Sequence, residues 1–280
     1  MAEPFFNVNG TWKSLDTAYV NVNGTWKETD VYVNVNGTWK LVSLKRVAVG
    51  GGANFDLFGA VKPLIGSAGN IEITLNGTYQ ATATTHAALG LSNALAGRKV
   101  RIINNGLIIG KEGVGGPGQW QTGSAGASGG TAIWIDPHHG CRSLEFYNNP
   151  GARVYAGGGG GGGGGGVRIR KRIDDSHKAV ESKGGHGGRG AGSGGGATGG
   201  GGGTTDHDYP LWSTGGTGGT GGNYGTAGGH GGAGYGYNQS VSGNFHGGGA
   251  GGAAGIAIHN VGTIKLTGYT DTSRIVGRRI

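Results

Sequence analysis

The feature that most constrains this chain is a run of ten consecutive glycines, from Gly157 to Gly166. It lies in a glycine-dominated stretch, roughly 110–255, that holds most of the 71 glycines of the protein. A glycine run has no side chains to bury, so composition alone favours a flexible coil. If this stretch folds, its backbones must pack directly against one another.

The glycine runs keep a triplet spacing that favours such packing. Residues with side chains recur at every third position, as at Thr214, Thr217 and Thr220, with glycine pairs between them. Three residues per turn is the period of the polyproline II-type helix. Glycine allows close backbone approach and keeps its N–H free to donate, whereas six prolines are too few for collagen. We therefore predict a packed bundle of polyglycine II helices in preference to a disordered coil.

A threefold repeat occupies the N-terminal part. The sequence Val-Asn-Gly-Thr-Trp-Lys occurs at 8–13, 22–27 and 35–40. Asn-Gly is the strongest two-residue turn signal, because both central positions of a type I′ turn need positive φ. We predict three short β-hairpins within residues 1–46.

Each predicted hairpin carries one tryptophan, namely Trp12, Trp26 and Trp39. A hairpin this small cannot bury a tryptophan by itself. Either the three indoles pack on one another in a miniature core, or each is presented to a threefold-symmetric partner. The second alternative would make residues 1–46 an attachment segment that caps a trimer.

Residues 47–110 are typical of a small, conventional β domain, and residues 87–96 within it are compatible with a short helix or a turn. Residues 111–280 then form a glycine-rich domain with closing C-terminal strands. The predicted fold class is mainly β and irregular: hairpin repeats, a small β domain, and a packed polyglycine II bundle with connecting loops. The strands expected in the β domain are 47–49, 71–75, 100–103 and 107–109.

The charged and reactive residues exclude several classes of protein. The net charge is +8, but the cations form no stripe interleaved with aromatic residues, so we expect no nucleic-acid partner. Cys141 is the single cysteine, which excludes a disulfide framework. The N-terminus has no signal-peptide features and no apolar run approaches membrane-spanning length, so we expect a protein made in a cytoplasm and not inserted in a membrane.

No motif indicates catalysis, a cofactor or a metal. The patterns of serine hydrolases, P-loop proteins and zinc proteases are absent. Segments 136–141 and 206–208 contain metal-ligand residue types, but neither spacing matches a zinc site. We therefore expect no enzyme, no cofactor and no metal.

A second repeat joins the β segments to the glycine runs. The segment Ile103–Gly110 leads into the first glycine-rich stretch, and Tyr147–Tyr155 leads into the ten glycines. His259-Asn260-Val261-Gly262 begins a similar closing segment. Strand, Asn-containing turn, strand and glycine helix would then form a repeating layer.

These motifs and the triplet glycine runs make residues 54–280 resemble the glycine-rich phage tail-fibre tip proteins, of which the long-tail-fibre adhesins of T-even-type phages are the best known. The resemblance implies a stack of polyglycine II helices whose loops contact a bacterial outer-membrane protein or lipopolysaccharide. It also implies that Trp12, Trp26 and Trp39 attach the chain to a trimeric tail-fibre protein of the virion. The Asn-Gly-Thr-Trp-Lys repeat departs from that family and is more similar to repeats of other phage tail proteins.

The segments that interrupt the glycine runs are the candidate receptor-binding loops, because function tends to reside on loops held by a rigid scaffold. Tyrosine and tryptophan are favoured anchors at binding surfaces. The basic segment 167–183, with Arg168 and Arg170, could also pair with lipopolysaccharide phosphates. Loops of an up-and-down bundle alternate between its two ends, so only some can reach one receptor. The predicted receptor-binding residues are Trp120, Tyr209, Leu211, Trp212, Tyr224, Tyr237 and Asn238.

Two other functions remain open at this point. The regular spacing of Thr214, Thr217 and Thr220 would also suit an ice-binding face on the same helix. A polysaccharide-degrading tail spike would need paired carboxylates in a groove, and no such pair is identifiable. We therefore predict a non-enzymatic adhesin at the tip of a tail fibre.

Overall fold

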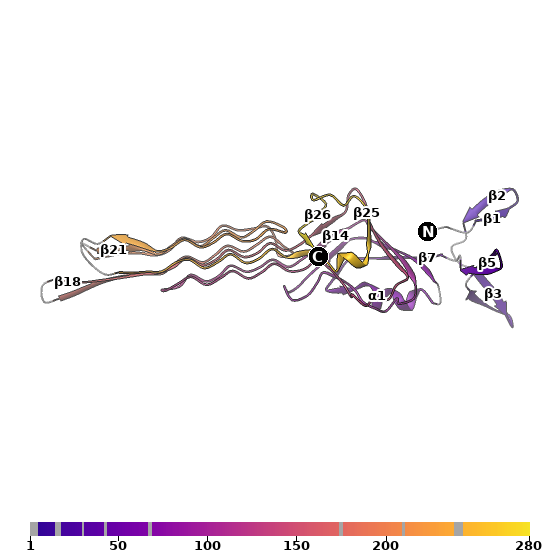
Figure 1. Ribbon diagram of the computed structural model, residues 1–280, viewed down its shortest axis with the longest axis horizontal. Helices are drawn as coiled ribbons and strands as arrows, with labels where there is room; N and C mark the ends of the chain where they lie inside the picture. The colour runs from indigo at the N-terminus through magenta and orange to yellow at the C-terminus, as the bar shows by residue number, and fades with distance from the viewer. Residues whose placement is uncertain are drawn as a thin grey trace.

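The computed structural model describes residues 5–14, 18–29, 31–41, 44–66, 69–173, 176–208, 211–237 and 243–280. The molecule is elongated, with hairpins at one end, sheets in the middle and glycine-rich segments that extend to the other end (Figure 1). The described residues contain one short α-helix, α1 (Leu57–Val61), followed by the 3-10 turn η1 (Lys62–Leu64). The prediction of a mainly β fold is confirmed. Within the described part of the chain, no helix is long and apolar enough to span a membrane.

The three N-terminal hairpins form as predicted, each as a separate two-stranded sheet. In the first turn φ is 52° at Asn9 and 81° at Gly10, the left-handed geometry that an Asn-Gly turn supplies. Asn7 braces this turn, because its Oδ1 accepts a hydrogen bond from the Gly10 N–H at 2.8 Å. The paired strands are β1 (Phe5–Val8) with β2 (Thr11–Ser14), β3 (Ala18–Val22) with β4 (Thr25–Thr29), and β5 (Tyr32–Val35) with β6 (Thr38–Leu41).

Two of the hairpin tryptophans, Trp26 and Trp39, are not buried in a miniature core. The exposed fractions of Trp26 and Trp39 are 68% and 67%. The side chain of Trp12 lies outside the described part of the structure. The first alternative drawn from the sequence is therefore wrong for at least two of the three indoles.

Three five-stranded parallel sheets form the middle of the molecule, and consecutive strands belong to different sheets. The chain thus passes through the three sheets in turn and stacks each circuit on the previous one, as a parallel β-solenoid. Sheet 1 contains β7 (Leu44–Val49), β10 (Asn70–Leu75), β13 (Lys99–Asn104), β16 (Ser143–Asn148) and β25 (Lys265–Gly268). Sheet 2 contains β8 (Gly52–Ala53), β11 (Thr78–Gln80), β14 (Leu107–Ile109), β17 (Arg153–Tyr155) and β26 (Ile275–Val276). Sheet 3 contains β9 (Phe55–Asp56), β12 (Leu89–Leu91), β15 (Ile133–Ile135), β24 (Ile256–His259) and β27 (Arg278–Arg279), and η2 (Val261–Thr263) follows β24.

Side chains that point into the solenoid form the main hydrophobic core. In β10, Ile71, Ile73 and Leu75 are fully buried, at the two-residue period of a strand. Ile73 pairs with Ile102 of β13, which pairs in turn with Phe146 of β16. Layers of apolar side chains therefore stack along the solenoid.

Residues 87–96 contain no helix but the strand β12 and, after it, the predicted alternative of a turn, in which the Ala96 N–H donates to Asn93 O at 3.1 Å. Leu89 and Leu91 of β12 are both buried, and a side chain two positions further along a strand returns to the same face. The helix that does form, α1, begins after Asp56, whose Oδ1 accepts a hydrogen bond from the Gly59 N–H at 3.2 Å.

The first two members of the second repeat occupy equivalent positions in the solenoid. Asn104 and Asn148 end adjacent strands of sheet 1, where the buried Asn104 Nδ2 donates to Asn148 Oδ1 at 2.9 Å. The third member also consists of a strand, an Asn-containing turn and a strand, but it lies at a different corner, because His259 ends β24 of sheet 3 and Lys265 begins β25 of sheet 1. In the last circuit the position equivalent to Asn148 is Gly268 of β25.

The glycine-rich segments are insertions at one corner of the solenoid. One leaves after β14 and returns at β15, and the other leaves after β17 and returns at β24. Both therefore connect sheet 2 to sheet 3. As a result, each of the three sheets contains strands from both 47–110 and 111–280, so the boundary expected at residue 110 falls inside the solenoid.

The run Gly157–Gly166 is buried along its whole length in the bundle. Its N–H groups donate in rotation to segments 121–130, 185–191 and 226–232, at 2.7 to 3.0 Å, and return to the same segment at every third residue. A Cβ added at any of the ten would lie 1.9 to 2.3 Å from a backbone atom of another segment. Since real Cβ atoms do not approach other atoms within 3.0 Å, only glycine fits here.

Candidate functional site

The end of the bundle remote from the solenoid carries two three-stranded sheets (Figure 1). One contains β18 (Val167–Ile173), β19 (Ser176–Ser182) and β23 (Gly243–Phe245), and the other contains β20 (Thr205–Asp208), β21 (Leu211–Thr214) and β22 (Tyr235–Tyr237). Val167 follows directly after the last of the ten glycines. We call these two sheets the tip.

A small hydrophobic cluster holds the two tip sheets together. It consists of Val167, Ile169, Val180 and Leu211. Leu211 was predicted to bind a receptor, but it is only 1% exposed. Its side chain is occupied by this cluster, because strand alternation turns it inward while its neighbour Trp212 turns outward.

Trp212 is the centre of an aromatic array on the tip. Its ring stacks on His207 at 6.4 Å between centroids, and Tyr235 meets it edge-on at 5.8 Å. Tyr235 is 57% exposed and Phe245, on the other tip sheet, is 52% exposed. Large apolar groups in contact with water at one end of a molecule are typical of a binding surface.

Trp120 lies where the bundle ends and the tip begins. The N–H of Gly166 donates to the adjacent Gln121 O at 2.8 Å, and the Trp120 side chain is 53% exposed. The hairpin that carries it, between β14 and β15, thus brings a further exposed indole to the same end of the bundle.

Tyr224 lies apart from the other predicted residues. Its ring stacks on Tyr155 of β17, with 4.7 Å between the centroids. The next residue, Gly225, donates its N–H to Ala156 O at 2.9 Å. The loop that carries Tyr224 therefore packs against the solenoid, at the end of the bundle opposite the tip.

The remaining predicted residues are only partly described. Tyr209 and Asn238 lie outside the described residues, and Tyr237 is described for its backbone, as the last residue of β22. His207, Tyr235 and Phe245 were not among the predicted site residues. The sequence carried a weak signal for them, since His207 and Tyr235 each stand two residues before a predicted residue, Tyr209 and Tyr237, and Phe245 ends the turn-flanked segment 243–245.

Positive charge also reaches the tip. Arg168 and Arg170 of β18 are both exposed, and Arg168 forms an ion pair with Glu181 on the neighbouring strand. The side chains of Lys171 and Arg172 lie outside the described part of the chain. An exposed guanidinium can bind a phosphate or carboxylate in two-point fashion.

Neither segment with metal-ligand residue types forms a metal centre among the described residues. In segment 136–141, Asp136 Oδ1 accepts a hydrogen bond from the His138 N–H at 2.8 Å, and His139 Nδ1 accepts one from the Cys141 N–H at 3.0 Å. These side chains thus hold their own turn.

Comparison with known proteins identifies the class of protein. The family model described as "Phage tail fibre adhesin Gp38" matches residues 14–280. The chain therefore belongs to the Gp38 family of phage tail fibre adhesins. This assignment agrees with the resemblance drawn from the glycine runs, and it favours adhesion over ice binding or polysaccharide degradation.

Among solved structures, the chain is similar to one titled "Crystal structure of the gp37-gp38 adhesin tip complex of the bacteriophage S16 long tail fiber". The identity is 17% and the TM-score 0.40, over 86% of this chain and 84% of that chain. No curated protein sequence matches.

Proposed function

We propose that this adhesin recognises a bacterial outer-membrane protein or lipopolysaccharide through the aromatic surface of its tip, without catalysing a reaction. We define the tip surface as Trp120, His207, Trp212, Tyr235 and Phe245. The observation that carries the proposal is that aromatic residues from separate loops, exposed except for the half-buried Trp212, gather at the end remote from the solenoid. Tyr209, Tyr237 and Asn238 belong to the same loops and stay in the proposal, whereas Leu211 and Tyr224 do not.

We also propose that the glycine segments are polyglycine II helices that hold the tip rigidly. Support comes from hydrogen-bond partners that recur at every third residue, the period of that helix. Rigidity matters because a preorganised surface loses less entropy on binding. Many fibres on one virion would add avidity to a modest single-site affinity.

The opposite end of the molecule is the proposed attachment site for a trimeric tail-fibre protein. Support comes from the exposed indoles of Trp26 and Trp39 and from the three repeated hairpins, one for each subunit of a trimer. Trp12 completes the set by its place in the repeat. The related structure named above is a gp37–gp38 complex by its title, and we propose an equivalent partner for this chain, with the complex at the virion tail-fibre tip.

The receptor-binding proposal is tested by adsorption of phage that carry Trp212→Ala, Tyr235→Ala or both. We expect the double variant to adsorb at least about tenfold more slowly, since buried aromatic anchors dominate binding energies. Tyr269→Ala is the matched control, because Tyr269 is 46% exposed but lies on the solenoid. Equal loss in the control and the tip variants would count against recognition by the tip.

The attachment proposal is tested separately by co-purification with the fibre protein. Trp26→Ser combined with Trp39→Ser should abolish co-purification while Trp212→Ala leaves it intact. Retention of the complex by the double serine variant would exclude the hairpin tryptophans as the attachment residues.

A further inference from the structure

A row of three residues crosses the outer face of sheet 3, far from the tip. Gly90 of β12 pairs in register with Asp56 of β9 on one side and with Trp134 of β15 on the other. Residues in register on parallel strands point to the same face, and two strand spacings separate Asp56 from Trp134 by about 9–10 Å. Because glycine has no side chain, the middle of this row is open.

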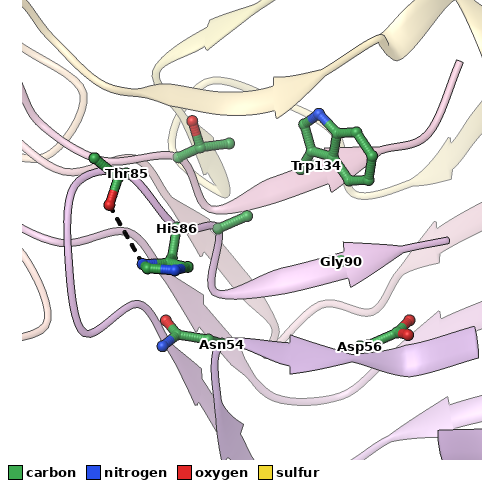
Figure 2. Close-up of a pocket in the computed structure, with 8 residues that line it drawn as sticks. Asn54, Asp56, Thr85, His86, Gly90 and Trp134 are labelled. Carbon is green, nitrogen blue, oxygen red and sulfur yellow. Dashed lines mark hydrogen bonds between the residues drawn. The ribbon is translucent and has the colours of Figure 1, made fainter. Parts of the chain in front are cut away.

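The opening is part of a cleft of about 340 Å³. Gly90 forms its floor, Trp134 and Asp56 stand on opposite sides, and His86 closes one end (Figure 2). Asn54 and Thr131 also line it. The volume falls in the range of small-ligand pockets, about 300–1,000 Å³. We call this the lateral cleft.

We propose that the lateral cleft binds a neutral sugar residue of a bacterial surface saccharide. Trp134 is 39% exposed although both neighbours in its strand are buried, so it presents an indole to the cleft. The face of an indole carries partial negative charge, which attracts the weakly positive C–H groups on one face of a pyranose ring.

The polar residues of the cleft suit the hydroxyl groups of such a ring. A sugar hydroxyl needs an acceptor for its proton, and Asp56 offers carboxylate oxygens at the side opposite Trp134. The Oδ1 atom of Asp56 already accepts a hydrogen bond from the Gly59 N–H of α1, whereas its Oδ2 atom has no hydrogen bond within the described residues. His86 and Thr131 add groups that can donate or accept.

The charge of the residues that line the cleft favours neutral sugars over acidic ones. No lysine or arginine is among the described residues that line the cleft, and Asp56 would repel an anion. Acidic sugars and phosphate groups are therefore disfavoured, while neutral hexoses and N-acetylhexosamines fit. This preference differs from that of the tip, where Arg168 and Arg170 favour anions.

The proposal can be tested with the full-length protein by calorimetry and by saturation-transfer NMR. The probes are glucose, galactose, N-acetylglucosamine, their disaccharides and dephosphorylated lipopolysaccharide core oligosaccharide. Gly90→Val is the most specific variant, because the nearest atom to a Cβ at Gly90 lies 3.8 Å away and the fold should accept the change while the floor is filled. We expect Gly90→Val and Trp134→Ala to weaken binding by about tenfold or more, and Asp56→Asn to weaken it less.

The controls separate this site from the tip. Trp120→Ala removes an indole that is more exposed than Trp134 but lies outside the cleft, and it should leave sugar binding unchanged. Trp212→Ala with Tyr235→Ala should slow adsorption and likewise leave sugar binding unchanged. Competition of lipopolysaccharide binding by the free sugar would assign the source to the cell surface. Absence of binding by every probe at millimolar concentration, or equal affinity of Gly90→Val and the wild type, would overturn the proposal. So would protection of the cleft by a bound fibre protein.

Discussion

Alanine at Gly161 should unpack the glycine bundle, whereas alanine at Gly202 should not. A Cβ at Gly161 would lie 2.0 Å from Gly219 O and 2.5 Å from Gly219 C, both backbone atoms. Because real Cβ contacts stay above 3.0 Å, the neighbouring segment must move by 3.0 − 2.0 = 1.0 Å. A Cβ at Gly202 would meet nothing within 4 Å, so this second change is a matched control in the same bundle.

The displacement acts on buried hydrogen bonds. Segment 216–222 donates to the central run through Gly216, Gly219 and Gly222, each at 2.8 Å. Lengthening the nearest of these by about 1 Å takes it out of bonding range and weakens the two beside it. Each buried group left unpaired costs about 1–3 kcal/mol, so we expect a loss of about 3 kcal/mol or more. Gly202→Ala should change stability by less than about 1 kcal/mol.

Hydrogen–deuterium exchange by mass spectrometry measures this difference directly. If the free energy of local opening falls by about 3 kcal/mol, peptides that contain Gly157–Gly166 should exchange roughly 150-fold faster. Peptides from the N-terminal hairpins serve as an internal reference. Wild-type protection in Gly161→Ala, or equal loss in both variants, would refute the view that backbone contacts hold the bundle together.

Glu112→Gln should destabilise the base of the bundle by about 1–3 kcal/mol at neutral pH. Burial raises the pKa of Glu112, but hydrogen bonds from Lys111 and the Gly194 N–H more than offset it, so this pKa lies below its ordinary value. Because the pKa of Glu112 is lower in the folded protein than in the unfolded chain, its carboxylate stabilises the fold at any pH above the unfolded pKa. This stabilisation is lost as the pH falls through the folded pKa. The urea midpoints of the variant and the wild type should therefore converge in acid. Asn148→Ala should lower stability by about 2–4 kcal/mol in urea unfolding, since it leaves the buried Asn104 Nδ2 and Tyr269 O unpaired; an unchanged midpoint would contradict that. Burial raises the pKa of Cys141 to about 11, so iodoacetamide at pH 8 should label it slowly in the folded protein and rapidly in urea.

The hairpins and the packed glycines were predictable because their signals are local. An Asn-Gly pair such as Asn9-Gly10 specifies its own turn geometry, and a run without side chains admits few ordered arrangements. The solenoid was not predictable in the same way. Ile71 pairs with Lys45 in one direction and Val100 in the other, and two-residue strands such as β8 are too short to show a period.

The candidate site residues were predicted from residue type alone, and residue type does not fix their position in the fold. Composition marks an aromatic residue as a candidate, but it does not say at which end of the bundle its loop lies. Tyr224 and Trp212 are both aromatic candidates in the sequence, yet Tyr224 stacks on Tyr155 of the solenoid and Trp212 is part of the aromatic array at the tip. Counting the passes of the chain along the bundle would have separated them.

The arrangement of the bundle explains how one scaffold can carry different recognition surfaces. The central run contacts backbone on every side, so a substitution there disturbs its neighbours. In the outer segments the third position faces solvent, as at Thr217 and Thr220, and can vary without cost to packing. The tip has its own hydrophobic cluster, which begins at Val167 directly after the last central glycine. Neither Trp212 nor Tyr235 belongs to that cluster. We therefore expect a change at either residue to alter the proposed receptor-binding surface while the cluster and the backbone contacts stay in place.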